Sequence, residues 1–116
     1  MKKISVAVLL VLGLASPALA SAFWGGTVIK VAGWDVLNVR AWPASHSQIV
    51  DSYDNGDHVS LTGRCKNTVN NVSFRSDAGG SANWKYGKMR KANVWCQVMS
   101  PGNQLGWVRG KFVWPE

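Results

Sequence analysis

The segment from Val36 to Arg40 constrains the fold more than any other part of the chain. Its central residues, Leu-Asn-Val-Arg, alternate between apolar and polar, and successive residues of a β-strand point to opposite faces. A second short segment of this kind, Gly106-Trp107-Val108, follows near the C-terminus. Between the two, the apolar stretches are short, they end at Gly, Asn or Asp, and no helical period is sustained. The sequence therefore predicts a small all-β domain.

The first 20 residues predict a cleaved secretory signal. Two lysines precede an apolar stretch from Val6 to Leu14, and Ala18-Leu19-Ala20 forms a small-residue cleavage site. The apolar stretch is too short to span a bilayer. We expect cleavage after Ala20, which leaves one domain (21–116) with no transmembrane segment, in the periplasm or secreted. The alternatives are an uncleaved anchor helix and a buried core helix.

The positive charge is concentrated in one segment. Without Lys2 and Lys3, 11 of the 13 basic residues remain against six acidic ones, a net charge of +5 on 96 residues. The segment from Arg64 to Asn93 holds seven of these basic residues and a single acid, Asp77. A mature chain of this length forms one domain with a modest core. The charge therefore belongs to this segment and not to the protein as a whole.

The two cysteines, Cys65 and Cys96, are expected to form a disulfide. Exported proteins fold in oxidising compartments, where paired cysteines are normally bridged. The alternative is a pair of buried free thiols. The sequence contains no Cys-x-x-Cys motif and no His/Cys cluster that would suggest redox chemistry or zinc.

Several short strands are predicted along the chain, joined by tight turns at residues 54–57 and 100–103. Residues 66–92 are rich in Asn, Ser, Gly and basic side chains, and we expect them to form an irregular hairpin tied at its base by the cysteines. Its most mobile part should be 76–82, and no helix of normal length is required. The predicted strands are 27–31, 36–40, 49–53, a strand around Val59 and Leu61, 94–99, and a final pair, or a strand with a short helical turn, within 105–113.

The order of these signals resembles the bacterial SH3-like (SH3b) domain. The resemblance rests on Leu37 to Arg40, a proline-containing loop, and the later Gly106-Trp107-Val108 motif after a Gly-Asn turn. It implies a small, partly open β-barrel of five to seven short strands, here with a disulfide-tied hairpin insertion at about 66–92. Many relatives are exported, and those attached to cell-wall hydrolases commonly bind peptidoglycan peptides in a groove between loops. By resemblance, the groove would lie near Arg40-Ala41-Trp42 and the turn before Gly106.

The sequence offers few candidates for catalysis. His46 and His58 are separated by a strand and a turn, and Asp51, Asp54 and Asp57 lie beside turns, where carboxylates normally cap the backbone. There is no glycine-rich phosphate loop, nucleophile elbow or metal-ligand spacing. We therefore predict that the protein is not an enzyme and uses no metal or cofactor.

Aromatic residues in predicted loops are the candidate ligand contacts. Trp34, Trp42 and Trp84 lie in turns or loops, where a large apolar ring suits stacking against a peptide or glycan. With Arg40 and Tyr86 they form the predicted ligand-binding set, and Trp42 is the first choice. The alternative is that Trp34 and Trp42 close the end of the barrel. Two further tryptophans, Trp95 and Trp107, are predicted to be structural.

The basic residues of the insertion form a second candidate surface. Together with Trp84 and Tyr86, they could contact an anionic lipid, an acidic glycan or an acidic protein, and secretion makes nucleic acid the least expected partner. The alternative is a solvated basic face without a ligand. The predicted basic patch consists of Arg75, Lys85, Lys88, Arg90 and Lys91.

Two functional hypotheses follow. The first is a non-enzymatic, exported SH3-like module that recognises a cell-envelope ligand, such as a peptidoglycan peptide of the cell wall. The second is a protein-protein interaction factor, an inhibitor or host-directed effector, that binds an envelope or other protein through the basic hairpin at 64–93.

Overall fold

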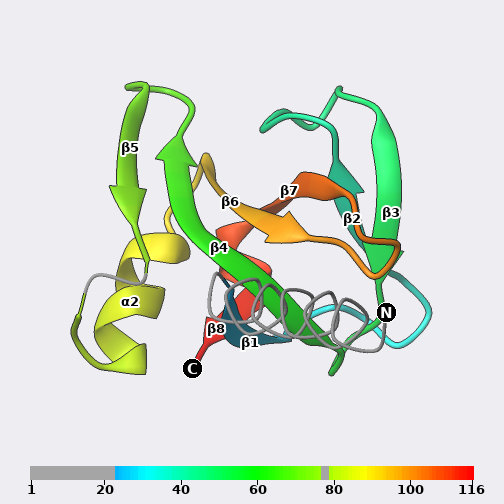
Figure 1. The fold of residues 1–116 in the computed structure, drawn as a ribbon, viewed down its shortest axis with the longest axis horizontal. Coiled ribbons are helices and arrows are strands. Elements are labelled where there is room, and N and C mark those ends of the chain that lie inside the picture. Colours follow the sequence, from blue (N-terminus) through cyan, green and yellow to red (C-terminus); the bar gives the residue numbers. More distant parts are fainter. Residues whose placement is uncertain (1–22, 77–78) are drawn as a thin grey trace, which may run out of the picture.

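Eight strands form a single antiparallel sheet in the computed structural model, which describes residues 23–76 and 79–116 (Figure 1). The strand order is β3-β2-β7-β6-β4-β1-β8, and β5 pairs with β4 beside this path. The predicted signal (1–20) lies outside the described residues. The strands are β1 (Trp24–Val28), β2 (Leu37–Arg40), β3 (Ile49–Tyr53), β4 (His58–Asn67), β5 (Val72–Arg75), β6 (Val94–Met99), β7 (Leu105–Arg109) and β8 (Val113–Pro115).

The predicted β-rich character is confirmed, and β6 has the predicted bounds. The sheet does not close over the described residues, because its path ends at β3 on one side and β8 on the other. The prediction of five to seven strands is wrong. The first strand begins at Trp24, where Gly25 and Gly26 allow close packing: a Cβ atom at Gly26 would lie 3.2 Å from Leu61 Cδ1. The insertion and the C-terminus contribute the further strands β5 and β8.

The predicted hairpin of the insertion is present as β4 and β5, but the insertion also contains a short helix that was not predicted. After the β4–β5 hairpin, the chain forms α2 (Ala82–Met89). Ser81 caps the helix, because its hydroxyl accepts a hydrogen bond of 3.2 Å from the Trp84 N–H. The helix packs on the domain through Met89, which is fully buried in the core. The predicted mobile stretch, 76–82, includes residues 77 and 78, which lie outside the described residues.

The core lies on the inner face of the bent sheet, and the alternation of apolar and polar residues along the strands explains why. On β2, β6 and β7 every second side chain points inward, so that Val39, Val98 and Val108 are fully buried. Cys65 and Cys96 face each other on β4 and β6 and form the predicted disulfide, with their Cα atoms 4.0 Å apart. The disulfide therefore joins two central strands from within the core.

A bulge bends β4 in the middle. Leu61 pairs with Val98 and Cys65 with Cys96, so β4 contains two more residues than β6 between these pairs. Gly63 lies at the bulge with a positive φ of 93°, a conformation that glycine adopts at little cost. Before the bulge β4 pairs with β1, and after it β4 pairs with β5. The bend thus directs the β4–β5 hairpin away from the body of the sheet (Figure 1).

Two carboxylates cap turns, as predicted. Asp51 on β3 accepts a hydrogen bond of 2.8 Å from the Gly102 N–H, and Asp57 accepts one of 2.8 Å from the Asp54 N–H. The bonds from Gly102 and Ser52 hold the pKa of Asp51 below its usual value. Asp51 thereby fixes the turn at 100–103 against β3.

Within residues 23–76 and 79–116, no helix has the length and the hydropathy needed to cross a bilayer.

Candidate functional site

The outer face of the sheet, opposite the core, brings aromatic and basic side chains together. Arg40 pairs with Trp107 across β2 and β7, and Trp95 pairs with Arg109 across β6 and β7. Lys66 on β4 is the other neighbour of Trp95. Directly paired residues share a face. Two indole rings therefore lie on one surface, with cationic side chains beside them.

Gly106 explains how β2 comes this close to β7. A Cβ atom at Gly106 would collide with Val39 Cγ1 and would lie 2.9 Å from the carbonyl oxygen of Arg40. The absence of a side chain allows the β2 backbone to lie directly against β7. The three residues of this motif thus have different roles. Gly106 allows β2 to lie close, Trp107 points outward, and Val108 is buried in the core.

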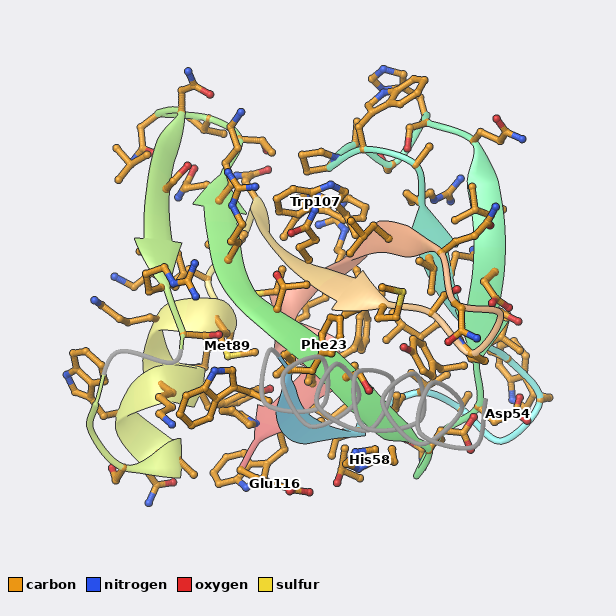
Figure 2. The ribbon with its side chains drawn as sticks, in the orientation of Figure 1. Phe23, Asp54, His58, Met89, Trp107 and Glu116 are labelled. Atoms are coloured by element: carbon orange, nitrogen blue, oxygen red, sulfur yellow. A yellow bond between two sulfur atoms is a disulfide. The ribbon has the colours of Figure 1, made fainter. Side chains whose placement is uncertain are left out.

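A hollow of about 300 Å³ is lined by Trp107, by the β4–β5 hairpin and by the loop at 41–47. Figure 2 shows Trp107 between the hairpin and this loop. Pro43 lines the hollow from the loop side. The hairpin contributes three cationic side chains, from Arg64, Lys66 and Arg75, together with Ser73 and Phe74. No carboxylate lines this hollow. The hollow therefore combines an indole ring with a rim whose charged side chains are all positive.

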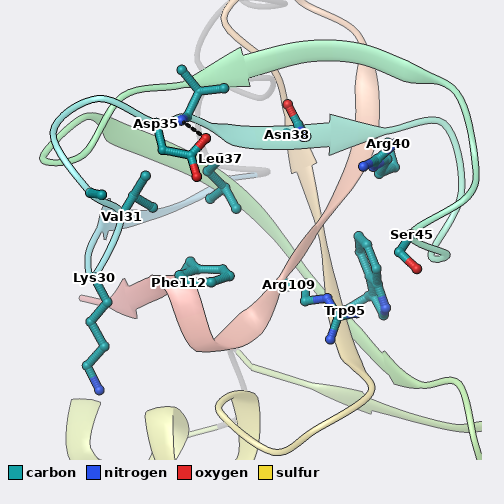
Figure 3. Close-up of a pocket in the computed structure, with 12 residues that line it drawn as sticks. Lys30, Val31, Asp35, Leu37, Asn38, Arg40, Ser45, Trp95, Arg109 and Phe112 are labelled. Atoms are coloured by element: carbon teal, nitrogen blue, oxygen red, sulfur yellow. Dashed lines mark hydrogen bonds between the residues drawn. The ribbon is translucent and has the colours of Figure 1, made fainter.

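A second hollow, of about 370 Å³, is lined by Trp95 and Arg109 (Figure 3). The Arg109 guanidinium lies 5.2 Å from the centre of the Trp95 ring, which is only 5% exposed. Arg40 and Ser45 line the hollow from the β2 side, and Lys30 and Phe112 line its other end. One carboxylate is present, that of Asp35, which accepts a hydrogen bond of 2.8 Å from the Val36 N–H.

Both hollows adjoin the loop at 41–47, which is held by Arg40. The Arg40 Nη1 atom donates a hydrogen bond of 2.9 Å to the carbonyl oxygen of Ser47, and the Ser47 hydroxyl donates one of 2.8 Å to the carbonyl oxygen of Trp42. The loop that borders both hollows is therefore fixed to β2 by the arginine. We call the whole surface the basic groove and define it by Arg40, Arg64, Lys66, Arg75, Trp95, Trp107 and Arg109.

The predicted ligand contacts are dispersed in the structure. Arg40 lies in the basic groove. The side chains of Trp34 and Trp42 are 89% and 56% exposed, and neither lines the two hollows. Trp84 lies on α2, half exposed, and Tyr86 on the same helix is buried, with its hydroxyl donating a 2.7 Å hydrogen bond to the carbonyl oxygen of Lys111.

The predicted basic patch is divided between two places. Arg75 lines the basic groove, where its Nη2 atom donates a hydrogen bond to the carbonyl oxygen of Thr62. The other four cations lie on α2 or just after it. Lys88 Nζ lies 4.5 Å from the centre of the Trp84 ring, and Lys85 Nζ lies 5.3 Å from that of Trp24. These two lysines therefore cover aromatic rings.

Five residues of the groove were missing from the predicted site: Arg64, Lys66, Trp95, Trp107 and Arg109. Their sequence signal is alternation, because Arg64 and Lys66 flank Cys65 and must point away from it on an extended strand. A disulfide that faces the core therefore implies two cations on the opposite face. The alternation could not indicate that this face meets Trp107, because that depends on the bulge in β4.

The histidines and acids considered for chemistry remain apart. His46 lies in the loop at 41–47, and His58 Nδ1 on β4 is 4.0 Å from Glu116 Oε1, with both side chains largely exposed. In the part of the chain that the structure describes, no three His, Cys, Asp or Glu residues are placed to hold a metal ion. The arrangement of the basic groove is suited to binding an anionic ligand by stacking and ion pairing.

No family model, curated protein or solved structure shows a significant match to this chain.

Proposed function

We propose that the protein is a non-enzymatic binding module of the bacterial cell envelope that holds a short, carboxylate-bearing wall peptide in the basic groove. The observation that carries the proposal is the hollow lined by Trp107, with a rim of Arg64, Lys66 and Arg75 and no carboxylate. An indole favours the apolar part of a peptide, whereas guanidinium and ammonium groups pair with its carboxylates. Peptidoglycan peptides combine both features.

Two further observations support an envelope location and an SH3-like module. The Cys65–Cys96 disulfide fits an oxidising compartment, such as the periplasm or the outside of the cell. The groove contains Arg40 and adjoins the loop after it, one of the two places where the SH3b resemblance implies a ligand; the other, the turn before Gly106, does not line the two hollows. We therefore propose that the sheet is a variant of the SH3b domain, exported and periplasmic or secreted.

The test is retention of the purified protein on insoluble peptidoglycan. Trp107→Ala should weaken binding by about 30-fold, because the loss of a central indole at a binding site typically costs about 2 kcal/mol. Trp34→Ala is the matched control: it removes the same side chain from a position that is 89% exposed and outside both hollows, and it should leave binding unchanged.

A second variant separates a lost contact from a lost fold. Lys66→Gln removes one rim charge while keeping most of the side-chain volume, and it should reduce retention severalfold at low salt. Binding that disappears entirely at moderate salt in the unaltered protein would indicate non-specific charge attraction and would contradict the proposal. The absence of any retention would favour the alternative, a protein partner for the basic segment at 64–93.

A further inference from the structure

A third hollow, outside the basic groove, lies where the end of α2 meets the 3-10 helix η1 (Gly110–Phe112). Its volume is about 290 Å³. Three cations line it, Lys30, Arg90 and Lys111, and they come from distant parts of the chain. Tyr86 and Phe112 complete the lining, and no carboxylate is present. We call it the helix-end hollow and define it by these five residues.

The backbone around Lys30 is held in an unusual conformation. Lys30 has a positive φ of 62°, a region that residues with side chains other than Asn and Asp rarely adopt. The neighbours on both sides are fixed, because the Ile29 N–H donates to the carbonyl oxygen of Phe112 and the Val31 N–H donates to Asn55 Oδ1. Backbone strain of this kind persists only where the surrounding structure maintains it.

This conformation directs the lysine toward α2. Figure 3 shows the Lys30 side chain extending toward the helix, and its Nζ atom lies 5.3 Å from the centre of the Tyr86 ring. The other two cations are brought in by a close contact between helices. A Cβ atom at Gly110 would collide with the carbonyl oxygen of Met89, so only glycine allows η1 to lie against the end of α2. Arg90 and Lys111, which follow Met89 and Gly110, thereby reach the same hollow.

The charges of this hollow are not neutralised within the described residues. Lys30, Arg90 and Lys111 form no ion pair with any residue in 23–76 or 79–116. The carboxyl end of α2 contributes a partial negative charge of about half a unit, which is small against three cations. Three converging cations without an acid match a compact dianion more closely than a single carboxylate.

We propose that the helix-end hollow is a binding site for a phosphate monoester group, which carries a charge of about −1.5 to −2 at neutral pH. The three cations ion-pair with its oxygens, and Phe112 and Tyr86 form the apolar wall beside it. This site is separate from the proposed wall-peptide groove, although both adjoin Lys30 and Phe112. The phosphate can belong to a soluble phosphorylated sugar or polyol, or to a lipid headgroup.

The experiment is an NMR titration of the purified protein with inorganic phosphate and with glycerol 3-phosphate. Backbone amides near Lys30, Arg90 and Lys111 should shift saturably. Lys111→Gln should weaken the affinity by about tenfold, because it removes one charge-assisted contact. Lys88→Gln is the matched control: it removes the same charge from α2, outside the three hollows described, and should leave phosphate affinity unchanged.

Vesicles distinguish the two sources of phosphate. Tighter binding to vesicles with phosphatidic acid than to glycerol 3-phosphate, lost in Lys111→Gln, would assign the site to a lipid headgroup; equal affinity would assign it to soluble phosphate monoesters. Equal weakening by Lys111→Gln and Lys88→Gln, or no saturable shifts with either soluble probe, would overturn the proposal. Because wall binding is tested with Trp107→Ala, the failure of one proposal is visible independently of the other.

Discussion

At the scale of single residues, Tyr53 shows how the fold changes the chemistry of a side chain. Its ring is 3% exposed, and its hydroxyl donates a hydrogen bond of 2.9 Å to the carbonyl oxygen of Met99. Burial, followed by the negative charges of Asp51 and Asp57, raises the pKa of Tyr53 from 10.0 to about 12. The folded protein therefore keeps this phenol neutral at a pH where the unfolded chain would ionise it.

The sign of the resulting pH dependence follows from this difference. Because the pKa of Tyr53 is higher in the folded state, the neutral phenol contributes its full stabilisation of the fold below pH 10. This contribution is lost as the pH rises from 10 toward about 12. We expect the denaturation midpoint in guanidinium to fall over this interval. Tyr53→Phe should be less stable at neutral pH by about 1 kcal/mol, through loss of the hydrogen bond. In Tyr53→Phe the denaturation midpoint should fall less between pH 10 and about 12. An identical fall of the midpoint in both proteins would contradict the assignment to Tyr53.

At the scale of elements, α2 depends on its cap and on its packing. The helix has only eight residues, contains Gly87 and has no acidic residue in its first turn. Helices this short are marginal alone. The bond from the Trp84 N–H to the Ser81 hydroxyl satisfies one of the free donors at its start, while Met89 anchors its end in the core. Both contacts are therefore needed to hold the element that carries Tyr86 and Arg90.

The cap can be tested directly. Ser81→Ala should lower the free energy of unfolding by about 1 kcal/mol, whereas Ser81→Asp retains a capping oxygen and should have little effect. Chemical denaturation measures the difference between the two variants. If both have the same stability, the Ser81 hydroxyl contributes nothing to α2.

At the scale of the whole molecule, the Cys65–Cys96 disulfide is the covalent link across the sheet. It joins β4 to β6, which pair with each other in the middle of the sheet. Both cysteines are almost completely buried. Since the bridge closes a loop with a sequence separation of 31 residues, it constrains the unfolded chain substantially.

Removing the disulfide should lower the free energy of unfolding by roughly 3–4 kcal/mol in the chain-entropy model. Denaturation curves of the oxidised protein and of Cys65→Ala with Cys96→Ala measure the difference. The single variants are unsuitable controls because each leaves a free thiol. Equal midpoints for the oxidised protein and the double variant would show that packing alone holds β4 against β6.

Much of the sheet could be predicted from sequence because strand signals are local. The strand at 94–99, the turn at 100–103 and the inward direction of Val39 and Val98 follow from alternation and turn residues. The disulfide also followed from the cysteine count and the expected export. The helix was missed because its local signals are weak, and its stability comes from Met89 in the core.

The basic groove could be predicted only in part, through Arg40 and Arg75. Alternation beside Cys65 determines by itself that Arg64 and Lys66 face away from the core. That they meet Trp107 was decided by tertiary structure, because the bulge at Gly63 turns the hairpin and Gly106 admits β2 against β7. The helix-end hollow likewise gathers residues 30, 90 and 111. The sequence by itself determined which face each side chain points to, since that depends on backbone geometry within a few residues. Only the tertiary structure decided which faces meet, because that depends on contacts between distant segments.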